Sequence, residues 1–305
     1  MGGIVPKGEN NDELIDHLVE ANYITKKEVE EVFRAVDRGD FFPGEFVEDA
    51  YRDLAMKEKN LHMSAPCIYC EVMDNMELRE GLSFLNIGSG TGYLSTLVGL
   101  LLGFHGVNHG IDIHEDVLKY SALKVEEFMK YSNGFDSITF CKPDFVLGNV
   151  ECIDPSFRHY DRIYCGARIP TDKSREEIKK LLKDDGILIY PFGEHLLKYK
   201  KTPPSTYEET SLLHVQFCDL VAKQPDDVSQ IRIYSQPYSL KASSRHVILK
   251  CLSKERLHMV EELPIPRRVV DYLKFFRNPE CPRPKKEVKV RTLSEEDISF
   301  RVVLR

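Results

Sequence analysis

A glycine-rich turn between an apolar run and a helical pattern could hold a nucleotide-type ligand. Residues 84–94 read FLNIGSGTGYL. Glycines let the backbone approach a ligand closely, and the N-terminus of a helix favours a negatively charged group. Asp112 follows the next apolar run, Val107–Ile111, and a carboxylate there can accept hydrogen bonds from both ribose hydroxyls. The alternative is a glycine turn that only connects a strand to a helix.

The same residues resemble the motifs of a known family. Gly88-Ser89-Gly90-Thr91-Gly92 resembles the first methyltransferase motif, and Gly110-Ile111-Asp112 resembles the second. Tyr160-Asp161-Arg162-Ile163-Tyr164 is similar to the motif beside the adenine, and residues 181–191 are similar to the late segment "LKPGGRLILP". Together with two leading helices, the pattern resembles protein-L-isoaspartate O-methyltransferase over residues 10–220. That enzyme uses S-adenosylmethionine to methylate the stray carboxylate of an isoaspartyl residue.

The resemblance implies a Rossmann-like α/β fold with S-adenosylmethionine as the cofactor. It places one set of residues around that cofactor: Asn86, Gly88, Ser89, Gly90, Thr91, Gly92, Asp112, Asn149 and Asp161. The family usually has acidic residues where Asn86 and Asn149 stand. An amide can still form a hydrogen bond, but it cannot match a charged acceptor. We therefore expect a cofactor site that is kept but weakened.

A short segment before a helical pattern carries the candidate catalytic residue. His62-Met63-Ser64-Ala65-Pro66 is similar to the active-site segment of the family, and this similarity makes Ser64 the serine at the catalytic position. A serine there could bind the incoming carboxylate and align it with the methyl donor, which is already activated. The alternative is a loop serine that caps the following helix. The family continues with histidines, whereas residues 67–69 read Cys-Ile-Tyr, so methyl transfer is expected to be weak or absent.

Cys67 and Cys70 form a C-x-x-C pair, but no second pair and no nearby histidine completes a zinc tetrad. We expect both cysteines to be small packing residues on the helix after Pro66, and we expect no metal site.

A second pair of segments near the C-terminus resembles a SOCS box. Residues 239–249, SLKASSRHVIL, place Leu240, Ser244, Val247 and Ile248 on one helical face. The segment Leu263-Pro264-Ile265-Pro266 then gives an extended entry to another helical pattern, because proline does not fit inside a helix. The first helix is similar to an elongin-binding box, although Ser244 stands where a cysteine is usual. The proline segment is similar to a cullin box of the type that selects cullin five.

The SOCS-box resemblance implies binding of elongin B/C and a cullin. Elongin contacts would involve Leu240, Ser244 and Ile248, and cullin contacts would involve Leu263, Pro264, Ile265 and Pro266. Exposed apolar faces of this kind normally need a partner. The alternative is a helical hairpin packed on the core of the same chain.

Composition excludes several classes of protein. The net charge of −7 argues against a nucleic-acid-binding surface, which is normally basic. No apolar run reaches the roughly 18 residues of a membrane span, and the start has no signal-peptide pattern. The cysteines lack the dense spacing of a secreted scaffold, so we expect a cytoplasmic protein. Myristoylation at Gly2 would add a membrane anchor, but Pro6 stands where the signal prefers Ser or Thr.

Alternating strand and helix patterns must position these residues. The expected strands are residues 84–87, 107–111, 138–141, 162–165, 187–190 and 212–217, and the expected helices are 92–102, 115–131 and 174–182. Two earlier helices lie within residues 11–38; Thr25 and Glu28 would form a capping box for the second, and Gly39 would end it. We expect a flexible N-terminus at 1–9, a methyltransferase-like domain at 10–235, a SOCS box at 236–278 and a tail at 279–305.

Two functions fit this organisation. In the first, a substrate adaptor of an elongin–cullin ubiquitin ligase binds S-adenosylmethionine and recognises proteins with isoaspartyl damage. In the second, the chain is an active protein-L-isoaspartate O-methyltransferase with a regulatory tail. The asparagines at 86 and 149 and the altered loop after Ser64 favour the adaptor. A weaker third interpretation is a methyltransferase for another acceptor.

Overall fold

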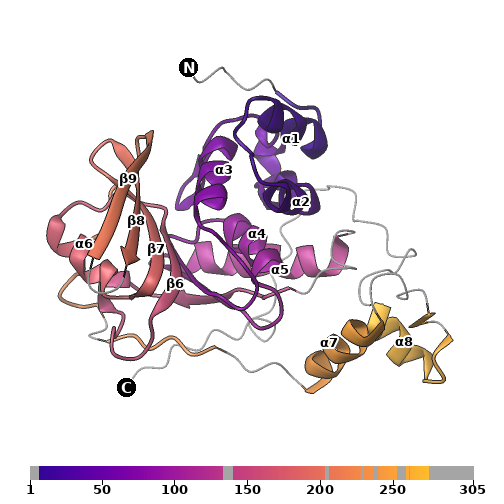
Figure 1. The fold of residues 1–305 in the computed structure, drawn as a ribbon. Coiled ribbons are helices and arrows are strands. Elements are labelled where there is room, and N and C mark those ends of the chain that lie inside the picture. The colour runs from indigo at the N-terminus through magenta and orange to yellow at the C-terminus, as the bar shows by residue number, and fades with distance from the viewer. Residues whose placement is uncertain are drawn as a thin grey trace.

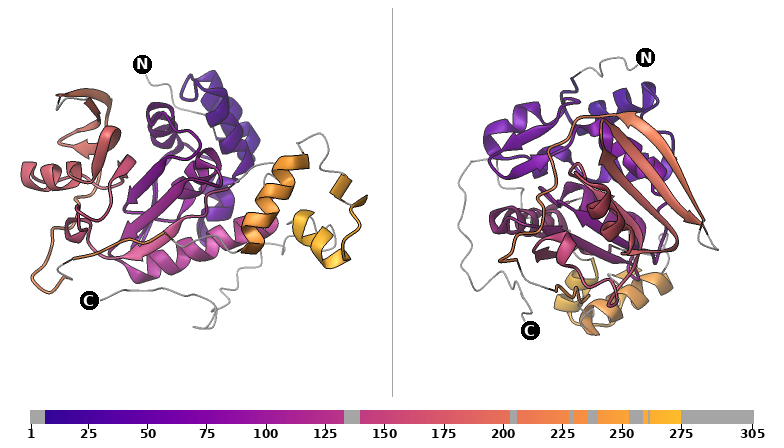
Figure 2. Two further views of the ribbon diagram at one scale, coloured as in Figure 1. Left: turned by 60° about the horizontal axis from the view of Figure 1, so that its bottom comes forward. Right: turned by 90° about the vertical axis from the view of Figure 1, so that its left-hand side faces the viewer.

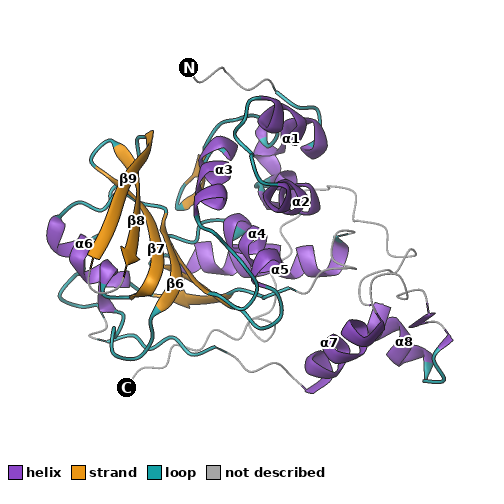
Figure 3. Ribbon diagram, viewed as in Figure 1, coloured by secondary structure: helices purple, strands orange, loops and turns teal. Residues whose placement is uncertain are grey.

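A seven-stranded sheet with helices on both faces forms the centre of the molecule (Figures 1 and 3). The computed structural model describes residues 7–132, 140–202, 206–227, 230–235, 240–252, 259–260 and 262–274. The strands of the sheet are β3 Ser83–Ile87, β4 Val107–Asp112, β5 Asp144–Leu147, β6 Tyr160–Cys165, β7 Leu182–Phe192, β8 His195–Thr202 and β9 Thr206–His214. The expected α/β class is therefore confirmed.

The strand order reverses beside β3, in the centre of the sheet. The order is β5-β4-β3-β6-β7-β8-β9, parallel from β5 to β7 and antiparallel from β7 to β9. The chain runs outward from β3 to β5 and then returns to place β6 on the other side of β3. Ligands of open α/β sheets bind at the carboxyl ends of the strands beside such a reversal.

Alternate residues of the central strands enter two apolar clusters, one on each face of the sheet. Phe84 and Tyr164 belong to the first cluster, and Leu85 and Ile163 belong to the second. The first cluster also takes buried residues from α1 Asn11–Glu20, α2 Lys27–Ala35, α3 Pro66–Asn75, α4 Tyr93–Leu102 and α5 Glu115–Tyr131, and the second from α6 Asp172–Lys179. Burial of both faces is typical of a parallel sheet.

The start of α2 differs from the sequence prediction. The backbone N–H and the hydroxyl of Thr25 both donate to Asp74 Oδ2, at 2.8 and 2.6 Å. Lys26 is the N-cap residue and makes no side-chain capping bond. The predicted capping box of Thr25 with Glu28 is therefore wrong, because a carboxylate from α3 takes the threonine donors in charge-assisted hydrogen bonds. The helix also ends before Gly39, which lies in the 3₁₀ helix Arg38–Phe41.

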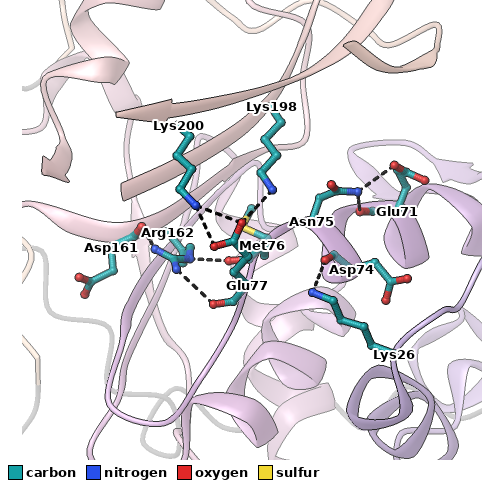
Figure 4. Close-up of polar contacts among 10 residues, drawn as sticks. All are labelled: Lys26, Glu71, Asp74, Asn75, Met76, Glu77, Asp161, Arg162, Lys198 and Lys200. Atoms are coloured by element: carbon teal, nitrogen blue, oxygen red, sulfur yellow. Dashed lines mark hydrogen bonds and ion pairs between the residues drawn. The ribbon is translucent and has the colours of Figure 1, made fainter. Parts of the chain in front are cut away.

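Arg162 of β6 fixes the C-terminal end of α3 to the sheet (Figure 4). Its guanidinium donates to the carbonyl oxygens of Met76 and Glu77, with Nη2 lying 3.1 Å from the Glu77 oxygen. Lys198 and Lys200 of β8 each lie 3.1 Å from the Glu77 carboxylate. Carbonyl groups at a helix end lack partners within the helix, so Arg162 satisfies them and holds the helix that follows Ser64.

Two C-terminal helices form a module with a small core of its own. The helices α7 Leu240–Leu252 and α8 Arg267–Lys274 lie at one side of the molecule, away from β8 and β9 (Figures 1 and 2). Val260, Val270 and Leu273 form an apolar cluster, and Ile248, Leu263, Ile265 and Val269 pack against it. Packing on the core of the larger domain, which was the alternative to a SOCS box, is limited in the described residues to the contacts given below.

Other sequence predictions vary in their outcome. Strands β3, β4, β6 and β7 lie where they were expected, and α5 has the predicted bounds. The strand expected at 138–141 begins outside the described residues, and Phe140 and Cys141 are not in a strand; the edge strand beside β4 is β5. The helix expected at 174–182 ends at Lys179, and β8 was not predicted. Gly2 and the tail 279–305 lie outside the described residues.

Within the described ranges, the longest apolar helical stretches fall short of what a membrane crossing requires. Within the same ranges, no group of three His, Cys, Asp or Glu side chains could hold a metal ion.

Candidate functional site

The carboxyl ends of β3, β4, β5 and β6 meet at one edge of the sheet through backbone hydrogen bonds. Gly88 N–H donates to Ile111 O at 2.9 Å, and Gly148 N–H donates to Asp112 O at 2.9 Å. Gly166 N–H, after β6, donates to Ile87 O at 2.8 Å. The glycine turn, Asp112 and the loop after β5 therefore share one surface, which we call the cofactor edge.

The glycine turn depends on residues without side chains. Gly88, Gly90 and Gly92 have φ values of +74°, +55° and +82°, which side chains rarely tolerate. A Cβ atom at Gly90 would overlap the carbonyl oxygen of His62, whereas nothing lies within 4 Å of the same position at Gly88. The turn is thus packed against the segment that carries Ser64, while its first glycine has open space beside it.

Asp112 lies at the end of β4, where backbone N–H groups bind its carboxylate. Its Oδ1 accepts from His114 N–H at 3.1 Å, and its Oδ2 accepts from Gly90 N–H at 3.4 Å. Burial raises the pKa of Asp112, and these backbone hydrogen bonds oppose the rise. The carboxylate is therefore oriented by the turn and retains acceptor capacity for two ligand hydroxyls.

Several buried polar atoms around the turn have no hydrogen-bond partner within the described part of the chain. They are Ser89 Oγ, Thr91 Oγ1 and Asn86 Oδ1. Buried polar groups are normally paired, so each such atom needs an explanation. A polar nucleoside ligand at the cofactor edge would supply donors and acceptors there, so the residues present fit the expected S-adenosylmethionine.

The two asparagines that replace acidic residues both have structural contacts. Asn86 Nδ2 donates to Ser95 Oγ at 3.0 Å, which ties β3 to α4. Asn149 Oδ1 accepts from Glu151 N–H at 3.0 Å, and its Nδ2 donates to Val221 O at 2.9 Å. Asn149 lies at the cofactor edge after β5, whereas Asn86 lies inside β3 beneath the turn.

Asp161 is not brought to the cofactor edge. It lies near the start of β6, where its Oδ2 accepts from the backbone N–H and the hydroxyl of Ser83, at 2.8 and 2.5 Å. Lys183 lies 2.8 Å from the same oxygen, and these contacts hold the pKa of Asp161 below its ordinary value. The start of a parallel strand lies at the opposite end of the sheet from its carboxyl end. Asp161 therefore links the start of β6 to the starts of β3 and β7 and does not approach the glycine turn.

Ser64 is buried beside two tyrosines, of which Tyr69 was expected only as part of the altered loop and Tyr164 was given no role near Ser64. Only 4% of its surface is exposed, and its backbone N–H donates to Tyr69 Oη at 3.0 Å. Tyr164 of β6 also places its hydroxyl near the Ser64 side chain. Burial raises the pKa of both phenols, so both remain protonated donors at neutral pH. Ser64 does not cap α3, whose N-cap residue is Ala65.

A buried arginine supports the segment that contains Ser64. Arg38 Nη2 donates to Ser64 O at 2.9 Å and to Leu54 O at 3.2 Å, and Nε donates to Ala50 O at 3.0 Å. The guanidinium lies over the rings of Phe42 and Tyr93. Burial lowers the pKa of Arg38, but arginine remains charged in proteins. One cation thus joins three loop carbonyls around the candidate site.

The C-x-x-C cysteines lie on α3, as expected. Cys70 is fully buried, and Cys67 is partly buried with its backbone N–H bonded to Asp53 at 2.8 Å. Burial raises the pKa of the Cys67 thiol to about 12, so it stays protonated and is a poor nucleophile.

Helix α7 divides the predicted elongin contacts between two faces. Leu240 is 88% exposed, Val247 is 58% exposed and Ser244 is also exposed. Ile248 instead packs against the small core of the module. In the cullin segment, Pro264 and Pro266 are exposed, whereas Leu263 and Ile265 pack against that core. The structure therefore brings Leu240 and Ser244 together on a free surface, but not Ile248.

Comparisons with known proteins agree with this architecture. The family model described as Protein-L-isoaspartate(D-aspartate) O-methyltransferase matches residues 9–225, and the SOCS box model matches residues 236–274. The protein-L-isoaspartate O-methyltransferase of Methanococcus vannielii is 31% identical over 220 residues, which cover 68% of this chain and 95% of that protein. That of Ignicoccus hospitalis is 30% identical over 225 residues, which cover 71% and 99%.

Solved structures show the same fold. The Plasmodium falciparum protein-L-isoaspartate O-methyltransferase, in complex with S-adenosyl-L-homocysteine, superposes with a TM-score of 0.59 at 19% identity. The match covers 70% of this chain and 99% of that chain. A second protein-L-isoaspartate O-methyltransferase has a TM-score of 0.55 at 20% identity and covers 70% of this chain.

The position of Asp112 gives a direct test of the cofactor edge. Asp112→Asn keeps an acceptor for His114 N–H but removes the charge that would bind ligand hydroxyls. We expect S-adenosylmethionine to bind about 10- to 100-fold more weakly, since hydrogen bonds to charged groups contribute about 1.5–3 kcal/mol. Calorimetric titration measures the change. Asp116→Asn, an exposed aspartate on α5, is the control; equal affinity of both variants would contradict the site.

Proposed function

Because the chain belongs to the protein-L-isoaspartate(D-aspartate) O-methyltransferase family and carries a SOCS box, we propose that it is the substrate adaptor of an elongin–cullin ubiquitin ligase. The methyltransferase-like domain would bind S-adenosylmethionine and recognise isoaspartyl sites in damaged proteins. The SOCS box would bind elongin B/C and a cullin. The observation that carries this proposal is the free apolar face of α7, on a module that already has its own core.

The donor side of the site supports cofactor binding. The backbone of Gly88–Gly92 and the carboxylate of Asp112 would hold S-adenosylmethionine, which supplies an activated methyl group when bound. Asn149 presents an amide at the same edge, and this amide is already bonded to Glu151 and Val221. A neutral and engaged side chain binds a polar ligand less strongly than a free carboxylate.

The acceptor side supports recognition more than turnover. Ser64 is kept, and the contact between Gly90 and the His62 carbonyl places its segment against the cofactor edge. However, Tyr69 stands where the family continues with histidines, and its phenol binds the Ser64 amide. Methyl transfer needs reacting atoms aligned at about 3–3.5 Å, and a small misplacement can cost about a hundredfold in rate. A loop remodelled in this way can bind a carboxylate without aligning it.

The retained serine also favours one alternative function, an active isoaspartyl methyltransferase. Its two tyrosine neighbours are protonated donors that could hold a carboxylate beside Ser64. The adaptor and the enzyme share their cofactor and their substrate class, so methyl turnover is what separates them at this site.

Elongin binding should depend on the free face of α7. Leu240→Asp combined with Ser244→Phe places an uncompensated charge and a bulky ring where an apolar groove would close. We expect this double variant to lose co-purification with elongins B and C while the methyltransferase-like domain keeps its unfolding temperature. Leu54→Asp makes the same kind of change at a side chain that is 56% exposed in that domain, and it should retain elongins. If the double variant still co-purified with elongins B and C, this face of α7 would not be the elongin-binding surface of a SOCS box.

Methyl transfer to isoaspartyl peptides should be weak or absent although the cofactor binds. The assay follows transfer of a labelled methyl group from S-adenosylmethionine to an isoaspartyl peptide, beside the matched aspartyl peptide. We expect at least about a hundredfold less turnover than a protein-L-isoaspartate O-methyltransferase, because the acceptor loop is remodelled. Turnover equal to that enzyme, and lost in Ser64→Ala, would instead establish the active methyltransferase.

A further inference from the structure

A segment between the two family matches is packed into the α/β domain. Residues 230–235, which we call the strap, follow the methyltransferase match that ends at 225 and precede the SOCS box match that begins at 236. Ile231 forms a parallel bridge with Ile153. Ile231 N–H donates to Cys152 O at 2.6 Å, and Asp154 N–H donates to Ile231 O at 2.8 Å. The strap therefore continues the domain beyond the boundary of its family match.

Side chains anchor the strap along its whole length. Arg232 lies 3.0 Å from Asp154, and Ile233 is 2% exposed within the second apolar cluster. Ser235 forms a 3.2 Å hydrogen bond with His109 Nε2, and Tyr160 forms one of 2.8 Å with Nδ1 of the same ring. Burial lowers the pKa of His109 to about 3, so the ring is neutral at physiological pH and can accept a hydrogen bond on one nitrogen.

One residue of the strap reaches the cofactor edge. The Cδ1 atom of Ile231 occupies the place that a Cβ atom at Gly148 would take. Gly148 N–H in turn donates to Asp112 O at 2.9 Å, next to the carboxylate assigned to the ribose. The chain nine residues before the strap also holds this loop, because Asn149 Nδ2 donates to Val221 O at 2.9 Å. The loop 148–154 thus lies between β4 and the strap.

The other end of the strap leads to the SOCS box. On α7, the His246 ring stacks on Phe104 with centroids 4.2 Å apart, and it meets His105 edge-on at 5.2 Å. Phe104 and His105 lie in the connection between α4 and β4. In the described part of the chain, the strap and this ring contact place the SOCS box beside the α/β domain, with Leu240 and Val247 left exposed.

We propose that the strap is a positioning element of the cofactor site, so that cofactor occupancy and the anchorage of the SOCS box are coupled. Ile231 supports the loop 148–154 from outside, and a bound cofactor would support it from inside. If an ordered strap raises cofactor affinity, a bound cofactor must stabilise the strap by the same free energy. The proposal rests on S-adenosylmethionine binding in the proposed function and adds that this binding reaches the ligase module.

The test uses two isoleucines of the same strap in the full-length chain. Ile231→Ala removes the atom beside Gly148, whereas Ile233→Ala removes a more deeply buried side chain of the second apolar cluster. Binding of S-adenosyl-L-homocysteine is measured by calorimetry, and unfolding temperature by fluorescence. We expect Ile231→Ala to bind about three- to tenfold more weakly, a typical effect of residues that act through others. We expect Ile233→Ala to lower the unfolding temperature more but to keep the affinity.

Hydrogen exchange then tests the reciprocal effect. Saturation with S-adenosyl-L-homocysteine should slow exchange at the strap amides of the wild-type chain, including that of Ile231, and should slow it less in Ile231→Ala. The coupling would be overturned if both variants lost the same affinity for S-adenosyl-L-homocysteine. It would also be overturned if the wild-type chain bound this ligand without any change in hydrogen exchange at the strap amides. Either result would leave the proposed function intact. A wild-type chain that binds neither S-adenosylmethionine nor S-adenosyl-L-homocysteine would overturn both.

Discussion

The site depends on one close contact, in which the backbone of Gly90 lies against the carbonyl group of His62. No side chain fits between them, so the turn at the end of β3 and the segment before α3 can meet directly. Arg38 holds this segment through the Ser64 carbonyl and joins it to two other loops. Arg162 fixes the far end of α3. The fold itself therefore holds the glycine turn against the segment that carries Ser64.

Asn86, Asn149 and Tyr69 stand where the family usually has other residues. We expect them to change the charge of the cofactor site and the alignment of the acceptor, while the fold around them is kept. Asn86 and Asn149 use their amides to tie β3 to α4 and the loop after β5 to Val221. Tyr69 binds the amide of the serine that would meet the acceptor. Each substitution keeps the shape of the site while reducing charged hydrogen bonding or acceptor freedom. Such a site suits recognition of a damaged carboxylate, and the strap connects it to the module that would recruit the ligase.

Local patterns predicted the central strands and the glycine turn with Asp112 after the next strand, because these have a distinct apolar period or spacing, whereas the Ser64 segment was found only through the family resemblance. Contacts between distant segments were not predictable. Thr25 and Glu28 match a capping box, but Asp74 takes the threonine donors. Asp161 lies in a segment that resembles the motif beside the adenine, yet Ser83 and Lys183 hold it at the start of β6, far from the glycine turn. Tyr164 and Arg38 lie far from Ser64 in the sequence and approach it only in the tertiary fold. Ile248 packs against the small core that includes residues of α8, and the helical periodicity of α7 does not predict this contact.

Reconstituted ubiquitin transfer tests the central claim most directly. The full chain is assembled with elongins B and C, a cullin of the type that its proline segment resembles, and the remaining ligase components. One substrate protein is supplied in two forms, freshly prepared and aged to accumulate isoaspartyl residues. The adaptor account predicts ubiquitin transfer that favours the aged form and disappears when that form is first repaired by a protein-L-isoaspartate O-methyltransferase. Equal transfer to the fresh, aged and repaired forms would contradict it.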